Sequence, residues 1–231
     1  MVNKYTIVIN NRSGIYQNYT LFTEKPEVTG ISNSSIWTNV YQASDVIFDS
    51  ADAQFEMLEN YQAIVGKWKG GPKEGARVGI GQTKKVNLGS LSDDGSLNPG
   101  TTLNMVSVDG GWAPSFDRLQ PPQSAFINAF EIDTGNDFTV ETAIQNNFFV
   151  GVAGSPNDSS SSPIATFRPE PGNRYQIKPS NVFYISFGQR LQVGQLVDVA
   201  KIRNPLRIDF ANSGPNIIIN HTPTGELVIA K

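Results

Sequence analysis

Short runs of β-branched and aromatic residues, each closed by a turn rich in Gly, Pro, Asn or Asp, recur from one end of the chain to the other. Runs of this length between turn-forming residues predict strands rather than helices. The expected strands are Tyr5–Asn10, Tyr19–Thr23, Ile36–Gln42, Phe55–Val65, Arg77–Ile80, Lys85–Leu88, Leu103–Val108, Ala125–Ile132, Phe148–Ala153, Ile164–Phe167, Tyr175–Ile177, Val182–Phe187, Gln195–Ala200, Leu206–Phe210, Ile217–Asn220 and Glu226–Ala230.

Alternation inside these runs indicates that each strand has one buried face. Phe183, Ile185 and Phe187 share one parity, and Arg207 and Asp209 are the polar positions of an otherwise apolar run. Many short strands with little helix cannot bury their apolar faces as one open sheet, so they pack as two sheets or close on themselves. The sequence therefore predicts an all-β fold, either an antiparallel β-sandwich or a closed, barrel-like sandwich.

Only the segment Asp137–Asn147 has a helical pattern, with Asp137 as its N-cap and Glu141 in the first turns, although a strand followed by a loop also fits. A length of 231 residues suits one large β domain. We therefore expect a single β domain over residues 1–231 with at most one short helix. The segment 89–124, which contains several Gly- and Pro-rich turns, is the candidate boundary between two β halves.

Residue types that most enzymes and metal sites need are scarce. The chain has no cysteine and one histidine, His221, which falls in a predicted turn. Zinc sites need several Cys or His ligands, and a Ser-His-Asp triad would have to use His221 without the G-x-S-x-G motif. We therefore expect no metal and no other cofactor, and interpret His221 as a surface residue of the turn.

Neither the charge nor the hydropathy pattern indicates a nucleic-acid or membrane partner. A net charge of −3 provides no overall attraction to nucleic acid or to an anionic membrane. The N-terminus lacks the pattern of a secretory signal, and no stretch approaches the roughly 18 apolar residues of a membrane-spanning helix. We expect a soluble, cytoplasmic protein without stable membrane insertion, and the sequence does not predict its oligomeric state.

Three segments resemble binding motifs only weakly. The glycine-rich Gly75–Gly81 lacks the order of a phosphate-binding fingerprint and leads into the strand-like Gln82–Leu88. The oxygen-rich Ser92–Asn98 does not have EF-hand spacing and fits ordinary turn chemistry. We interpret as a solvated basic loop the cluster around Trp68 that contains Lys67, Lys69, Lys73, Arg77, Lys84 and Lys85.

The segment Ser107–Arg118 is the best candidate for a ligand site. It leaves a strand, turns on two glycines and contains a tryptophan and a phenylalanine between charged residues. An indole can cover the apolar face of a sugar ring while Asp and Arg form hydrogen bonds with its hydroxyls. The predicted ligand-binding residues are Asp109, Trp112, Phe116, Asp117 and Arg118.

The alternative interpretation of this segment is structural. Trp112 would then point inward to anchor the loop, and Asp109 would cap the turn. Trp37 and Trp68 belong to other runs, and nothing in the sequence shows whether they lie near Trp112.

Three classes of function remain. The first is binding of a small polar ligand, most plausibly a carbohydrate, through surface loops, and in general composition the chain resembles lectin-like and cytolysin-like β proteins. The second is a cofactor-free cyclase, isomerase or glycosidase that uses carboxylate pairs, because Glu131 and Asp133 would share one strand face and Asp198 and Asp209 have apolar neighbours. The third is a membrane-active, pore-forming protein in which Ser32–Gln42 refolds into a hairpin.

Overall fold

The all-β prediction is confirmed by the computed structural model, which describes residues 3–157 and 160–230. Strands dominate the described residues, which contain two short α-helices. The strands are β1 Lys4–Asn11, β2 Tyr19–Thr23, β3 Glu27–Val28, β4 Trp37–Asn39, β5 Gln42–Ala43, β6 Asp52–Lys69, β7 Arg77–Val86, β8 Ser90–Leu91, β9 Leu97–Asn98, β10 Thr102–Val108, β11 Ala113–Phe116, β12 Phe130–Thr134, β13 Phe148–Ser155, β14 Ser162–Phe167, β15 Arg174–Lys178, β16 Val182–Phe187, β17 Leu196–Val197, β18 Leu206–Asp209, β19 Asn216–His221 and β20 Leu227–Ile229. The α-helices are α1 Val140–Gln145 and α2 Phe210–Ser213, and two 3₁₀ turns span Asn33–Ser35 and Val199–Lys201.

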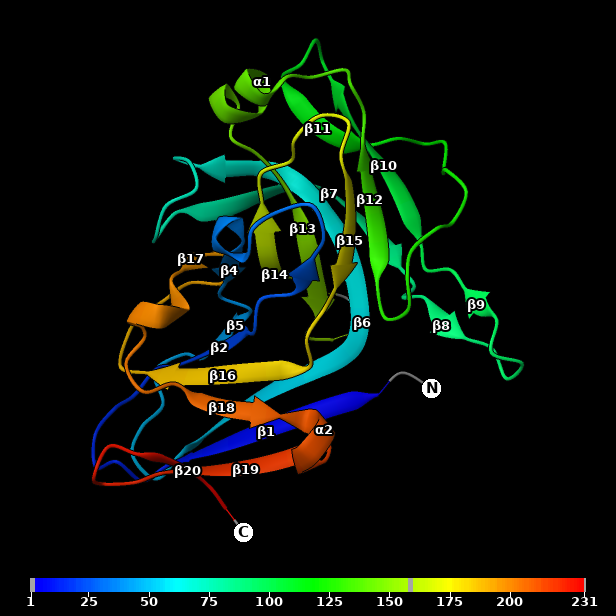
Figure 1. The fold of residues 1–231 in the computed structure, drawn as a ribbon. Coiled ribbons are helices and arrows are strands. Elements are labelled where there is room, and N and C mark those ends of the chain that lie inside the picture. The colour runs from blue at the N-terminus through cyan, green and yellow to red at the C-terminus, as the bar shows by residue number, and fades with distance from the viewer. Residues whose placement is uncertain (1–2, 158–159, 231) are drawn as a thin grey trace.

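One long strand organises the largest sheet. Strand β6 has 18 residues; its first part pairs with β1, its second part pairs with β7 along the same edge, and β13 pairs along the other edge. The nine-stranded sheet has the order β17-β4-β14-β13-β6-β1-β19-β20, with β7 attached to β6. Figure 1 shows β6 curving from the strands at the bottom of the molecule to those at the top, so that the sheet forms a curled half-barrel.

Two smaller sheets pack against the curled one. We call "lower half" the strands β1, β19, β20 and the start of β6, together with the four-stranded sheet β18-β16-β2-β5 (Figure 1). We call "upper half" the strands β7, β13, β14, β4, β17 and the end of β6, together with the five-stranded sheet β11-β10-β12-β15-β3. Two pairs of neighbouring strands in the described residues are parallel, β1 with β19 and β10 with β12, whereas the other pairs are antiparallel as predicted.

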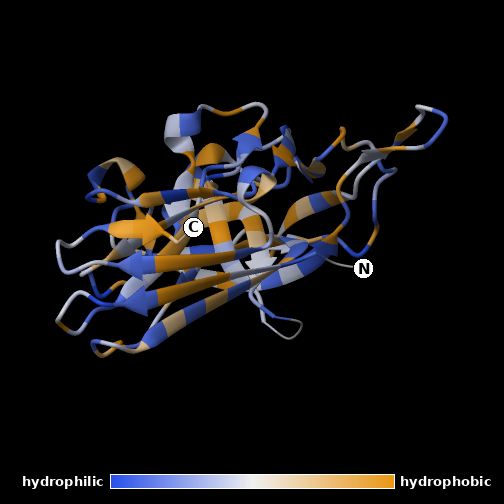
Figure 2. Ribbon diagram, turned by 90° about the horizontal axis from the view of Figure 1, so that it is seen from below, coloured by the Kyte–Doolittle hydropathy of each residue, from blue (hydrophilic) through white to orange (hydrophobic). Residues whose placement is uncertain are grey.

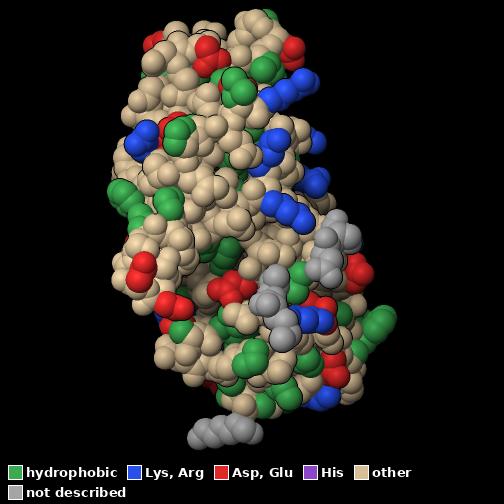
Figure 3. Space-filling model, turned by 90° about the vertical axis from the view of Figure 1, so that its right-hand side faces the viewer, with side chains coloured by type: hydrophobic (Ala, Val, Ile, Leu, Met, Phe, Trp, Pro, Cys, Tyr) green, Lys and Arg blue, Asp and Glu red, His purple; other side chains and the backbone are tan. Residues whose placement is uncertain are grey.

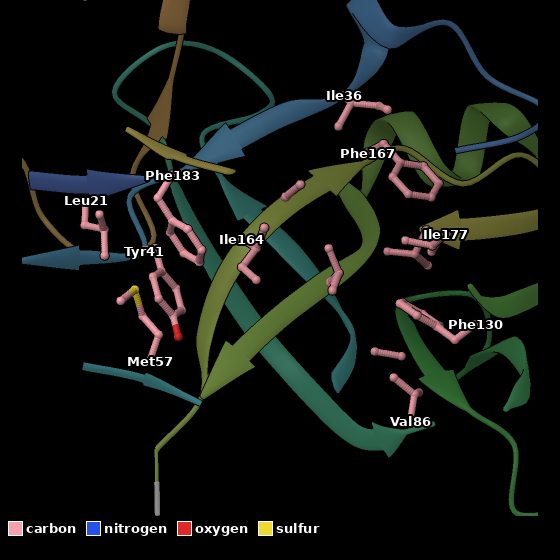
Figure 4. Packing of buried hydrophobic residues seen from close by; sticks show 14 of the residues in the cluster. Leu21, Ile36, Tyr41, Met57, Val86, Phe130, Ile164, Phe167, Ile177 and Phe183 are labelled. Atoms are coloured by element: carbon pink, nitrogen blue, oxygen red, sulfur yellow. The ribbon is translucent and has the colours of Figure 1, made fainter. Parts of the chain in front are cut away.

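A continuous apolar core fills the space between these sheets. Figure 4 shows Leu21, Tyr41, Met57 and Phe183 pointing toward one another at one end of the core, with Phe130, Phe167 and Ile177 at the other. This arrangement follows from strand alternation, which Figure 2 shows as apolar and polar residues taking turns along the strands.

The outer face of the upper half of the curled sheet holds a second, smaller apolar cluster. It contains Ile64, Trp68, Phe149, Ala153 and Leu196, with Trp37 and Val78 packed against it. Strand β13 is covered on both faces, and all eight of its residues are buried.

The helical prediction for Asp137–Asn147 is confirmed over a shorter range. Helix α1 spans Val140–Gln145, and its N-cap is Thr139 rather than Asp137, because the Thr139 hydroxyl accepts a hydrogen bond from the Thr142 N–H. The one-turn helix α2 was not predicted; it follows strand β18 directly, and Asp209 caps it.

Candidate functional site: the two hollows beside helix α1

Trp112 projects from a tight turn between β10 and β11. Asp109, Gly110 and Gly111 have φ values of 55°, 68° and 96°, the left-handed region that glycine adopts without strain. The backbone N–H groups of Gly111 and Trp112 both donate to the carbonyl of Val108 at 3.1 Å. The side chain of Trp112 is therefore directed outward and is 68% exposed, which argues against an inward-pointing anchor.

The first hollow lies beside this indole, and its volume is about 640 Å³. It is lined by Gly110, Gly111, Trp112, Asn136, Asp137, Phe138, Thr139, Thr142, Gln145 and Asn146. These residues come from the β10–β11 turn, the loop before α1 and the polar side of α1. The hollow therefore combines one large exposed ring with amide and hydroxyl groups.

Hydrogen bonds hold the three segments of the first hollow together. The Asn146 amide donates to the carbonyl of Gly111 at 3.4 Å, which ties the end of α1 to the turn. The Ser107 N–H donates to the carboxylate of Asp137 at 2.5 Å, which ties β10 to the loop before the helix. Trp112 is thus exposed on a supported turn rather than on a free loop.

The five predicted ligand-binding residues do not form one site. Trp112 lines the first hollow, whereas Asp109 lies in the turn outside its lining. Phe116 is buried in the core with 3% exposure, because alternation along β11 turns its ring inward. Asp117 and Arg118 follow the far end of β11, so at roughly 3.3 Å per extended residue they lie about 16 Å and about 20 Å along the chain from Trp112. Of the five predicted residues, Trp112 is therefore the one that lines the first hollow.

Sequence reasoning missed the polar residues that Trp112 faces, namely Thr139, Thr142, Gln145 and Asn146. The segment 137–147 was recognised as a helix, yet no local pattern links it to residues 110–112. Their contact arises because β10 pairs with β12, and β12 leads into α1.

A second hollow lies on the other side of α1, with a volume of about 430 Å³. Helix α1 contributes Val140 and Ile144, which are 40% and 47% exposed. The outer face of the curled sheet contributes Trp37, Trp68 and Arg168. The structure therefore brings all three tryptophans of the chain to the surroundings of one short helix.

Comparisons with protein-family models, with curated proteins and with solved structures found no match to this chain. The site is therefore interpreted from its own geometry.

The carboxylate pairs proposed for catalysis have structural partners. Glu131 and Asp133 do share one face of β12, but Arg174 from β15 lies 3.6 Å and 3.0 Å from their oxygens. Glu131 is also fully buried and bonded to Ser124 and Gln176. Both carboxylates are therefore held in place by partners within the sheet, as in a structural ion-pair network.

Asp198 and Asp209 also have local roles. Asp198 caps the 3₁₀ turn Val199–Lys201 by accepting from the Ala200 N–H, and Asp209 caps α2 by accepting from the Ala211 N–H. Capping by a short acidic side chain accounts for both positions.

His221 is buried, contrary to the prediction of a surface turn residue. It is the last residue of β19, has no exposed surface, and its Nδ1 lies 2.9 Å from the Tyr19 hydroxyl. Its ring packs on Phe187 at 4.1 Å. Burial lowers the pKa of His221, so the ring is neutral near pH 7 and serves as a polar core residue.

Five of the six residues of the basic cluster lie on the paired strands β6 and β7, and Lys73 lies in the loop between them. Lys69 pairs with Arg77, and Lys84 and Lys85 lie further along β7. None of the six cations forms an ion pair with a residue in the described ranges 3–157 and 160–230. Figure 3 shows a row of Lys and Arg side chains down one flank of the molecule.

The other two weak motifs are ordinary structural features. The glycine-rich segment is the start of β7 and is followed by strand, as predicted. Ser92–Asn98 belongs to the β8–β9 hairpin, in which the Asp94 carboxylate accepts from the N–H and hydroxyl of Ser96. Among the residues that the structure describes, no three His, Cys, Asp or Glu side chains gather as metal ligands would.

A third hollow lies where β16 and β18 of the lower half meet the ends of β3 and β15, and it contains charged groups. It has a volume of about 640 Å³, and Glu24, Lys25, Tyr184 and Asp209 are among its lining residues. Glu24 accepts hydrogen bonds from Ser180 at 3.0 Å and from Tyr184 at 3.4 Å. Burial lowers the pKa of Lys25, and nearby Asp198 opposes this shift.

No helix within the described ranges has both the length and the apolar character needed to cross a bilayer.

Proposed function

We propose that this protein binds carbohydrate in the first hollow, with the Trp112 indole as the stacking platform. The observation that supports this proposal most is the 68% exposure of Trp112 beside a concave polar surface. An indole that is 68% exposed on a turn fixed by hydrogen bonds contributes little to the core, and an exposed aromatic ring beside a hollow is typical of a binding surface.

The chemistry of the lining fits a sugar. A pyranose presents an apolar C–H face and a rim of hydroxyls, and the hollow offers one ring together with amide and hydroxyl groups of Asn136, Thr142 and Gln145. Amides both donate and accept, so they match hydroxyls better than charged groups do. The volume of about 640 Å³ lies in the range of roughly 300–1,000 Å³ typical of small-ligand sites.

Calorimetric titration with a panel of neutral oligosaccharides tests this proposal. We expect at least one member to bind, and Trp112→Ala to reduce its affinity by about tenfold or more, since covering about 60 Å² of apolar surface at about 25 cal/mol per Å² contributes about 1.5 kcal/mol. Trp112→Phe is the matched variant and should retain part of the affinity. Absence of binding across the panel, or equal binding by Trp112→Ala, would contradict the proposal.

A cofactor-free enzyme is the second candidate, and the third hollow supports it. Glu24, Lys25 and Tyr184 place an acid, an amine with a lowered pKa and a phenol in one concave site. A screen of glycoside hydrolysis and isomerisation substrates tests it, with Glu24→Gln as the variant that should lose any activity found. Activity that survives Glu24→Gln would remove this hollow from consideration.

The pore-forming alternative has the least support. Ile36, Val40 and Tyr41 of the segment Ser32–Gln42 are each at most 2% exposed. Extracting such side chains from the core costs roughly 1.5–3 kcal/mol each. Leakage of dye from liposomes at micromolar protein would revive this alternative.

A further inference from the structure

Arg168 lines the second hollow without a partner for its charge. It forms no hydrogen bond and no ion pair with any residue in the ranges that the structure describes, and its Nε is buried without a partner. Its guanidinium carbon lies 5.7 Å from the centre of the Trp68 ring. The terminal nitrogens are not among the buried atoms, so they remain accessible from the hollow.

The platform under Arg168 is fixed by the fold. Trp68 is 3% exposed, and its indole N–H donates to the Thr166 hydroxyl at 3.2 Å. That hydroxyl in turn donates to the side-chain oxygen of Asn39 at 3.2 Å. Arg168 directly follows the last residue of β14, the strand that carries Thr166, and its guanidinium lies over the indole.

An arginine in this environment matches a carboxylate. The Nε–H of Arg168 is a buried donor without a partner, and an unmade buried hydrogen bond costs roughly 1–3 kcal/mol. The N–H groups of the two terminal nitrogens add four accessible donors. A carboxylate and a phosphate both accept two parallel hydrogen bonds from the planar fork. The carboxylate carries the smaller negative charge and is therefore repelled less by Glu170 in the same hollow.

The remainder of the second hollow suits a hydroxylated ring attached to that carboxylate. Trp37 is half-buried at the wall and offers apolar surface, while Ser32, Ser35 and Glu170 provide polar groups. Glu170 is exposed and its carboxylate accepts from Asn173 at 3.0 Å, so it is free to accept further hydrogen bonds from hydroxyls. Because Glu170 repels anions, a ligand carboxylate is directed to Arg168 and its hydroxyls to Glu170.

We propose that the second hollow binds an acidic sugar, a uronic acid, with its carboxylate on Arg168 and its ring against Trp37. The choice of a sugar among carboxylates rests on the proposed function, whereas the preference for an anion rests on the second hollow alone. The cavity of about 430 Å³ accommodates a single ring.

Titration of the full chain with glucuronate and with glucose, which differ only at C6, tests the proposal. Binding is followed by the indole N–H signal of Trp68 in a two-dimensional NMR spectrum. We expect glucuronate to bind about tenfold more tightly than glucose, since a charge-assisted bond contributes roughly 1.5–3 kcal/mol, and to weaken as salt is added.

Variants separate the charge of Arg168 from its geometry. Arg168→Met should reduce glucuronate affinity about tenfold, and Arg168→Lys should give an intermediate loss because the ammonium lacks the fork. Glu170→Gln should strengthen binding a few-fold by removing a like charge. Trp112→Ala should leave glucuronate binding unchanged, and each variant is checked for an unaltered thermal unfolding midpoint.

Equal binding of glucose and glucuronate, or full glucuronate affinity in both Arg168 variants, would overturn this inference. Neutral oligosaccharides that bind in a Trp112-dependent way alongside such a result would leave the proposed function standing. Conversely, benzoate that binds through Arg168 where glucuronate does not would overturn the choice of a sugar acid.

Discussion

In the lower half of the molecule even the exposed aromatic rings contact one another, as Tyr16 and Phe48 do at 5.0 Å, whereas in the upper half Trp112 is exposed with no ring against it among the described residues. Phe210 stacks on Tyr5 at 4.5 Å and meets Phe183 edge-on at 5.5 Å, and Tyr19 is bonded to the buried His221. Near α1, Trp112 is 68% exposed. The proposed function builds on this difference, because it places ligand binding at the α1 end of the upper half.

The largest expected effect is on stability and comes from the lower half. Phe183→Ala should lower the free energy of unfolding by about 3–5 kcal/mol, because it removes a ring packed against Tyr41 and Phe210. Trp112→Ala should change it by less than about 0.5 kcal/mol. Urea unfolding of both variants measures the contrast, and a large loss for Trp112→Ala would show that this ring stabilises the fold.

Substitution of two glycines by alanine tests how closely β6 and β7 of the upper half pair. A Cβ at Gly66 would overlap the carbonyl oxygen of Gly79, so Gly66→Ala should cost about 1–3 kcal/mol through overpacking. At Gly81 the nearest atom would be 3.6 Å away, and Gly81→Ala is the matched control. Equal unfolding midpoints for the two variants would mean that the strands separate easily at this position.

His221 should make the stability of the protein depend on pH. Burial holds its pKa in the folded state below the unfolded value of about 6.5, so the unfolded chain takes up a proton first as the pH falls. Stability from this group is therefore complete above about pH 6.5 and decreases below it by at most about 1.4 kcal/mol per pH unit. In His221→Gln the free energy of unfolding should therefore depend less on pH between pH 7.5 and 5.5. An unchanged dependence would show that carboxylates, and not His221, cause it.

The smallest effect concerns the support of the first hollow. Thr139→Ala removes the N-cap of α1 and should lower the free energy of unfolding by about 1 kcal/mol. Thr139→Ser keeps the capping oxygen and should restore it. If Thr139→Ala binds sugar as tightly as the native chain, the position of α1 does not matter for the first hollow.

Much of the fold follows from local pattern. Alternation in Leu206–Phe210 and similar runs identified strands and their buried faces, because periodicity reports burial directly. The parallel pairing of β1 with β19 could not be predicted, since those strands are about 200 residues apart in sequence and only the three-dimensional packing brings them together.

The candidate site was predictable only where local sequence pattern determines it. The two glycines before Trp112 predicted a turn that exposes the indole. The position of Phe116 was predicted wrongly, because β11 begins directly after Trp112 and strand alternation turns the Phe116 ring into the core. Asn146 lies at the first hollow and Arg168 at the second because of the order in which the strands pair. Residue spacing in the sequence does not reveal that order.

The most direct test of the claim that the α1 end binds ligand is NMR mapping of a sugar titration onto the three indole N–H signals and the backbone amides. We predict that a neutral oligosaccharide shifts the signals of Trp112, Thr142 and Asn146 and leaves those of Phe183 and Ile208 in the lower half unchanged. Shifts that gather around Glu24 and Tyr184, or that leave Trp112 unaffected while ligand binds, would contradict the account.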